Sequence, residues 1–220
     1  MSSSNSAQAQ YDPYNLAADK GPCNFDSRQA FVGNAVYALP FNRNNLVKGW
    51  QYGIIARAHS GNPFTVMDGF DRADLGDNGG IGNSTGGGER PNLVPGKSNN
   101  PKVGSVTEWY NPASFALQDP GTIGNLGRNS LVAPGFADFD MSLDKETRLT
   151  EHLGLQIRFE VFNTFNRPDF ALPDQTLYEG PPCSGDINCP GVGVPNDDAG
   201  RIHNTVFDSR QMQLGAKFTF

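Results

Sequence analysis

The chain has 220 residues, a formal net charge of −6, and 26 glycines and 16 prolines that interrupt regular structure often. The acidic balance argues against a general nucleic-acid binder, because phosphate contacts require clustered lysine and arginine. Frequent glycine and proline also argue against a helical bundle. A loop-rich chain built on strands remains, with no nucleic-acid partner.

The N-terminal region, residues 1–27, is predicted to be a polar segment or an extracellular loop. It opens with MSSSNSAQAQ, which lacks the basic and apolar regions of a secretory signal peptide. The chain contains no run of 18 apolar residues, which excludes a membrane-spanning helix. This does not exclude membrane-spanning strands, which need only about 9–11 residues.

Residues 28–220 are predicted to hold five strands, near 29–41, 50–66, 136–145, 152–165 and 208–220. The clearest pattern is in the fourth, where Leu155, Ile157 and Phe159 alternate with polar residues. Such alternation places one set of side chains on each face of a strand. The second, third and fifth strands alternate in the same way, with a misfit at Ile55.

The first strand is apolar on both sides, so its facing is ambiguous. Simple periodicity favours Phe31, Tyr37 and Leu39 on the apolar face. An internal echo favours the other side: the FDSRQ of residues 25–29 recurs at 207–211, which would make Val32 and Val36 equivalent to Leu214 and Phe218.

The connections alternate in length. Short turns are expected at 42–48 and 146–152, and long glycine-, asparagine- and proline-rich loops at 67–134 and 166–204. Structureless loops that long are unusual in a compact domain but typical outside an outer-membrane barrel, whose periplasmic turns are short. The fold class expected is therefore all-β, with antiparallel up-and-down strands of an incomplete outer-membrane β-barrel. A soluble β-sandwich has similar alternation and remains the alternative.

The C-terminus, QLGAKFTF, resembles the β-signal of outer-membrane proteins through Gln213, Gly215, Phe218 and Phe220. The assembly machinery reads that signal as an exposed edge strand, by β-augmentation. Four other segments extend the resemblance: GTIGNLGRNSLVAPGFADFDMSL (121–143), LQIRFEVFNTFNRPDF (155–170), WYNPASF (109–115) and ERPNLVPG (89–96). Together they resemble the C-terminal barrel segment of TonB-dependent receptors, of the Oar-like type with a carboxypeptidase-regulatory-like domain.

That resemblance implies a structural part of a substrate-uptake pore in the outer membrane of a Gram-negative bacterium. The implied partners are outer-membrane lipid, the barrel-assembly machinery, and the missing barrel strands and plug, from a parent chain or other subunits. Bacterial barrels need at least about eight strands, and five are predicted here. The chain is therefore expected to be a fragment that does not transport alone, and no cofactor is expected.

The alternative to a transporter is a secreted soluble β-sandwich, either a carbohydrate-binding module or a serine hydrolase. The hydrolase would use Ser84 in GNSTG, which matches G-x-S-x-G, with His59, His152 or His203 as the base. No apolar strand precedes this motif and no helix pattern follows it, so a chance match in a glycine-rich stretch is favoured. The chain is expected not to be an enzyme.

Two further sets of residues are candidate ligands or cross-links. Asp68, Asp71, Asp74 and Asp77 recur every three residues, but without the spacing of a calcium loop, so a solvated acidic loop is favoured over a metal site. Cys183 and Cys189 lie in PPCSGDINCP and could close a small disulfide loop in an oxidising compartment. The pairing of Cys23 is left open.

Overall fold

The structure is a computed structural model that describes residues 15–41, 43–44, 47–70, 72–73, 89–180 and 193–220. The chain divides into two compact units. One, which we call the sheet unit, comprises Ser27–Gly61, Gly135–Phe170 and Thr205–Phe220. The other, which we call the loop unit, comprises Met1–Asp26, Asn62–Pro134 and Ala171–Asn204.

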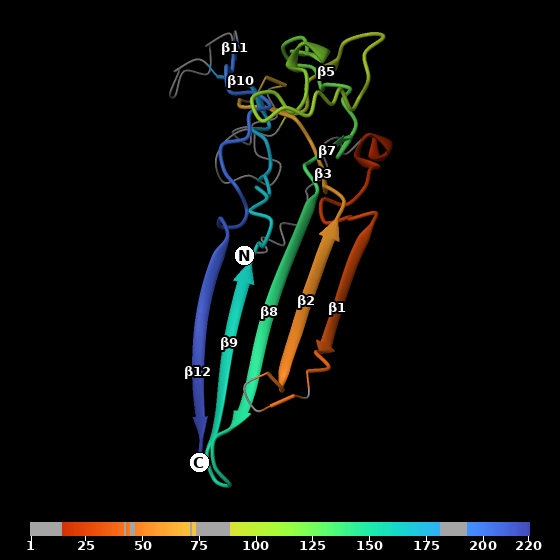
Figure 1. The fold of residues 1–220 in the computed structure, drawn as a ribbon. Coiled ribbons are helices and arrows are strands. Elements are labelled where there is room, and N and C mark those ends of the chain that lie inside the picture. Colours follow the sequence, from red (N-terminus) through yellow and green to blue (C-terminus); the bar gives the residue numbers. More distant parts are fainter. Residues whose placement is uncertain (1–14, 42, 45–46, 71, 74–88, 181–192) are drawn as a thin grey trace. The chain divides into compact units, whose positions relative to one another are not determined.

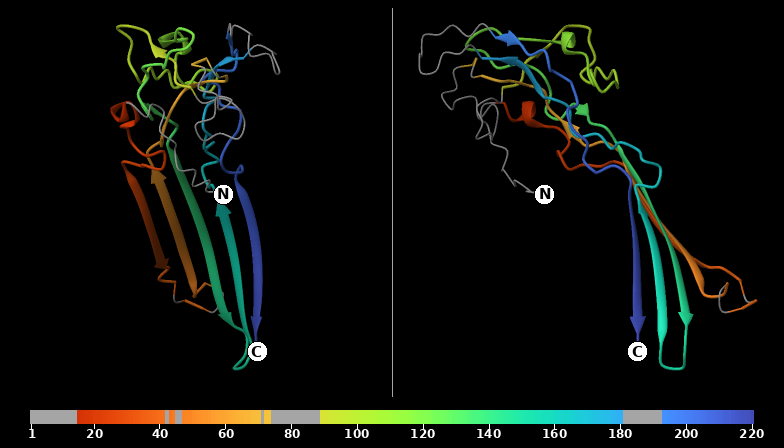
Figure 2. Two further views of the ribbon diagram at one scale, coloured as in Figure 1. Left: turned by 180° about the vertical axis from the view of Figure 1, so that it is seen from behind. Right: turned by 60° about the vertical axis from the view of Figure 1, so that its left-hand side comes forward.

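The sheet unit is one antiparallel sheet of five strands in the order β1-β2-β8-β9-β12 (Figure 1). These strands are β1 (Ala30–Ala38), β2 (Trp50–His59), β8 (Phe136–Arg148), β9 (Gly154–Phe162) and β12 (Gln211–Thr219). Figure 2 shows them as a single twisted layer. The sheet is open, because β1 and β12 are its two edges. The all-β, antiparallel fold class is confirmed.

Helix is nearly absent from the described residues, which contain only the 3₁₀ turns η1 (Leu16–Asp19) and η2 (Pro112–Ser114). In the described part of the chain, no helix has the length and apolar character needed to cross a bilayer.

The second strand ends earlier than the alternation predicted. β2 stops at His59, whereas the prediction extended it to residue 66. Pro63 and Phe64 instead form the short strand β3, which pairs with β7 (Leu131–Val132) in the loop unit. Gly61 and Pro63 favour this break, because glycine weakens a strand and proline removes a ladder donor.

The register settles the facing of the first strand. Phe31 pairs with Ala58 and Tyr37 with Tyr52, whereas Val32 pairs with Arg57. Cross-strand partners share a face, so Phe31 and Tyr37 lie on the apolar face and Val32 on the polar one. The facing favoured by simple periodicity is correct, and the one favoured by the FDSRQ echo is wrong.

The apolar face of the sheet is largely exposed rather than sealed against a second layer. Phe31, Met212, Leu214 and Phe218 are between 58% and 74% exposed. A soluble sandwich would bury these side chains between two sheets. The described residues of the sheet unit provide no such second sheet. This face therefore requires an apolar environment outside the unit.

The predicted long loops are not structureless. In the loop unit, β4 (Met67–Asp68), β10 (Thr176–Glu179) and β11 (Val194–Pro195) form one small sheet, and β5 (Asn92–Leu93) pairs with β6 (Phe115–Ala116). Tyr110, Leu126 and Leu131 are buried in its core. Alternation could not predict strands of two to four residues, because they are too short to show a period.

A matched pair of substitutions in β2 tests the two faces. Ile54 lies on the apolar face opposite Met141, and Ile55 lies on the polar face opposite Asp140. We expect Ile54→Arg to lower the free energy of unfolding in lipid vesicles by about 2–4 kcal/mol, the cost of arginine near the bilayer midplane. Ile55→Arg places the same side chain beside a carboxylate and should cost far less. Guanidinium titration in vesicles measures both; equal losses would contradict the assigned faces.

Candidate functional site on the polar face of the sheet

The polar face of the five-stranded sheet carries a belt of charged side chains. The register places Arg57 of β2 opposite Asp138 of β8, and Asp144 of β8 opposite Arg158 of β9. Each charge alternates along its strand with a residue of the apolar face, so the alternation that creates one face also creates the other. The belt therefore draws charges from β2, β8 and β9.

Two adjacent carboxylates of β8 share one arginine of β2. Arg57 Nη2 lies 2.6 Å from Asp138 Oδ2 and 3.0 Å from Asp140 Oδ2. The arginine side chain is 46% exposed, whereas the two aspartates are 12% and 14% exposed. The guanidinium is thus held on the water side of the pair and offsets the repulsion between the two carboxylates.

A second bridge joins β8 to β9. Arg158 Nε lies 3.2 Å from Asp144 Oδ1 and 3.0 Å from Glu160 Oε1. Glu160 in turn accepts a hydrogen bond from Gln213 Nε2 on β12. Polar contacts between side chains therefore connect β8, β9 and β12 on this face.

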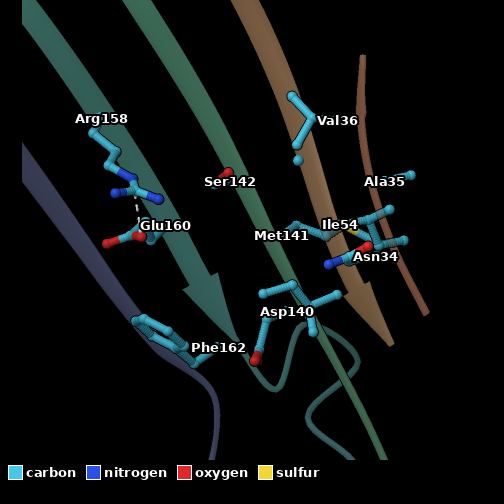
Figure 3. Close-up of a pocket in the computed structure, with 12 residues that line it drawn as sticks. Asn34, Ala35, Val36, Ile54, Asp140, Met141, Ser142, Arg158, Glu160 and Phe162 are labelled. Atoms are coloured by element: carbon cyan, nitrogen blue, oxygen red, sulfur yellow. Dashed lines mark ion pairs between the residues drawn. The ribbon is translucent and has the colours of Figure 1, made fainter. Parts of the chain in front are cut away.

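A hollow of about 340 Å³ lies over the middle of the sheet. Figure 3 shows the Arg158–Glu160 ion pair of β9 near Ser142 and Asp140 of β8. The residues that line the hollow include Asn34, Val36, Ile55, Asp140, Ser142, Arg158, Glu160 and Phe162. Arg158 is 52% exposed and pairs with Glu160, and Asp140 pairs with Arg57 outside the lining. Ion pairs at the edge of water are the chemistry of a hydrated wall rather than of a catalytic centre.

The predicted hydrolase residues do not form a site in the described residues. Ser84 lies outside them. His59 ends β2 and stacks on Phe136, at 5.0 Å between ring centroids, whereas His152 lies in the turn between β8 and β9, at the other end of the sheet. His203 belongs to the loop unit, where its Nε2 lies 3.9 Å from Asp198 Oδ2. Within the sheet unit, the two histidines are too far apart to serve one nucleophile.

The other predicted ligands and cross-links are only partly described. Asp71, Asp74, Asp77, Cys183 and Cys189 lie outside the described residues. Cys23 is exposed and unbonded. Among the described residues, no cluster of three or more His, Cys, Asp and Glu side chains is arranged to hold a metal ion.

Asp68 is buried, although the sequence suggested a solvated acidic loop. It lies in β4, its backbone forms an isolated antiparallel β-bridge with Glu89, and the residue is fully buried. Burial raises the pKa of its carboxyl to about 7, and the nearby Gln118 side chain and Arg72 lower it only in part. Neither carboxylate oxygen has a well-aligned hydrogen-bond partner, which adds to the cost of ionising Asp68, so the carboxyl is mostly protonated below pH 7.

Glu89 organises the same buried cluster and was missed by the sequence reasoning. Its carboxylate accepts hydrogen bonds from the backbone N–H groups of Arg72 and Ala73 and from Gln118 Nε2, at 2.8–3.0 Å. These donors come from segments distant in sequence, so no local sequence pattern predicts these hydrogen bonds. Glu89 fixes the backbone that follows β4.

The predicted assembly residues lie in or just after the edge strand β12. Gln213 and Gly215 lie on its polar side and Phe218 on its apolar side, opposite Leu155. Phe220 follows the strand and is 100% exposed. One long side of β12 pairs with β9 and the other has no strand among the described residues.

Strand length, an exposed apolar face and a hydrated charged face together define a sheet that crosses a membrane. The five strands have 9 to 13 residues, against about 9–11 needed to cross a bilayer. A family model described as "Outer membrane beta barrel domain" matches residues 1–213. The chain belongs to this family, which places it in the outer membrane. No curated protein and no solved structure matches it significantly.

The raised pKa of Asp68 predicts a pH-dependent stability of the loop unit. An ordinary carboxyl pKa of 3.8 in the unfolded chain and about 7 in the folded one give a contribution that is complete below pH 3.8 and lost as the pH rises through 7. The full span is about 4 kcal/mol.

We expect Asp68→Asn to flatten the pH profile of unfolding between about pH 4 and 7, whereas Asp119→Asn, at an exposed acid in the same unit, should leave it unchanged. The emission of Trp109, which is buried in this unit, measures the transition in a Trp50→Phe background. A profile identical in the two variants would contradict the assignment.

The shared arginine of the belt gives another prediction. Arg57→Gln removes both ion pairs and leaves two carboxylates side by side, so we expect a loss of about 1 kcal/mol, which shrinks at 1 M salt. Lys217→Gln is the control, since it removes a cation from the same face without breaking these pairs. The measurement is the free energy of unfolding in vesicles. A salt-independent loss would exclude an electrostatic origin.

Proposed function

We propose that this chain forms the C-terminal part of the barrel of a TonB-dependent outer-membrane receptor of the Oar-like type, and so part of the wall of a substrate-uptake pore. The observation that carries this proposal is β12, an edge strand that ends the sheet with the residues of a β-signal. In this proposal the charged belt faces the water-filled lumen and the apolar face contacts lipid.

The connections support an outer-membrane orientation. The turns β1–β2 and β8–β9 are short and lie at one end of the sheet, where β12 also ends (Figure 1). The long connections, β2 to β8 and β9 to β12, join the opposite strand ends. Because barrel turns are short on the periplasmic side, we place the short-turn end in the periplasm and the strand ends joined by the long connections on the extracellular side.

Strand parity defines what must complete the wall. Five alternating antiparallel strands make β1 and β12 run in the same direction. If a barrel were built only from copies of this sheet, all inserted in the same orientation, β12 of one copy would lie parallel to β1 of the next. Bacterial barrels are antiparallel throughout with an even strand number. The complement therefore contributes an odd number of strands, at least about three.

We further propose that these five strands do not transport alone, and that the chain is not an enzyme. The plug and remaining strands would come from a parent chain or other subunits. An in-frame plug domain encoded directly upstream would support this origin, and a stop codon there would contradict a parent chain.

The β-signal is the part of the proposal most open to experiment. Wild-type chain should partition into vesicles that contain the bacterial barrel-assembly machinery and become protease-protected. Removing Phe220 should slow this assembly severalfold, because the terminal aromatic of the edge strand is lost. Thr219→Ala is the matched control at the adjacent position. A stable, monodisperse monomer in plain buffer would refute the membrane proposal itself.

A further inference from the structure

One charged side chain interrupts the apolar face of the sheet. Of the residues that the register places on this face, only Lys145 carries a charge. It lies in β8 opposite Trp50 and Ile157, close to the short-turn end. An ammonium at the bilayer centre is costly, whereas one near the interface reaches the headgroups along its apolar stem.

The ammonium of Lys145 is directed toward the short turn between β1 and β2. Its Nζ lies 5.1 Å from the ring centroid of Trp50 and donates a 3.1 Å hydrogen bond to the carbonyl oxygen of Lys48. Lys48 is itself exposed and comes two residues before β2. The main chain thus brings a second lysine to the same strand end.

Aromatic residues surround this strand end on the same face. Tyr37 and Tyr52 pair across β1 and β2 one row further in, and Phe218 lies near the end of β12. Tyr37 and Phe218 are 59% and 58% exposed. Aromatic girdles of this kind mark the level of the lipid headgroups in membrane barrels.

We infer that Lys145, Lys48 and Trp50 form a site for the phosphate of an anionic phospholipid in the inner leaflet. The inference rests on the proposed orientation, which puts this strand end on the periplasmic side. Two lysines supply charge for the phosphate, and the Trp50 ring holds the Lys145 ammonium by a cation–π contact. The acyl chains of the lipid would lie along the exposed apolar face toward Tyr52.

Brominated lipids test this site, because bromine quenches a nearby tryptophan. Full-length chain is reconstituted in phosphatidylcholine vesicles that contain an equal fraction of brominated phosphatidylglycerol or brominated phosphatidylcholine. The chain has two tryptophans, so the Trp50→Phe variant supplies the Trp109 signal to subtract. We expect the brominated anionic lipid to quench Trp50 more, with a preference that high salt weakens.

The lysine variants identify the side chains responsible. Lys145→Gln and Lys48→Gln should each reduce the preference about fivefold, the equivalent of about 1 kcal/mol for a lysine at a membrane surface. Lys217→Gln, on the polar face, should leave it unchanged. Inorganic phosphate at 50 mM should not displace the lipid, since it lacks acyl chains; displacement would show a free-phosphate site instead.

The outcomes separate this inference from the proposed function. Equal quenching by both brominated lipids, or an equal effect of Lys217→Gln, would overturn the phospholipid site and leave the membrane placement intact. Absence of quenching by either lipid would overturn the membrane placement of the sheet.

Discussion

The hydrogen-bonded register of the five-stranded sheet is the constraint on which the other features depend. A slip of one residue would exchange the two faces, because side chains alternate with a period of two. Gly49 helps to fix the register where β2 begins. It has φ of +82°, a β-carbon there would lie 2.3 Å from the Glu146 carbonyl oxygen, and its own carbonyl accepts a 3.0 Å hydrogen bond from the Glu146 N–H. Only glycine allows that approach, so β2 enters the sheet at one position against β8.

The register also explains why the charged belt coexists with an exposed apolar face. Arg57 and Arg158 each contact two carboxylates on a half-exposed surface, where ion pairs add little stability and water solvates the heads. In a sealed core the same charges would carry a large desolvation cost. The chemistry of this face therefore suits a wide aqueous lumen, and that of the opposite face suits lipid.

The sequence allowed the sheet to be predicted better than the loop unit, for a physical reason. In β9 and β12, nine residues alternate between apolar and polar within a single strand, which is enough to assign the two faces without knowing the neighbouring strands. The fold class could therefore be predicted from these segments. β1 carries apolar residues such as Phe31 and Val32 on both sides, and only its pairing with β2 decides its facing. The burial of Asp68 and Glu89 depends on donors and neighbours far away in the chain, which no local pattern encodes.

The two edge strands of the sheet have unpaired backbone groups. β1 and β12 each leave a row of backbone N–H and C=O groups without a strand partner in the described residues. In water such edges recruit other strands, and in hydrocarbon each unsatisfied group costs several kcal/mol. In the proposed barrel, a lipid-facing sheet with open edges is therefore stable only when both edges are completed, and the shared direction of β1 and β12 restricts that completion to an odd set of strands. In that proposal the alternating side chains fit the faces to lipid and water, and the backbone of the two edge strands needs further strands for its hydrogen bonds.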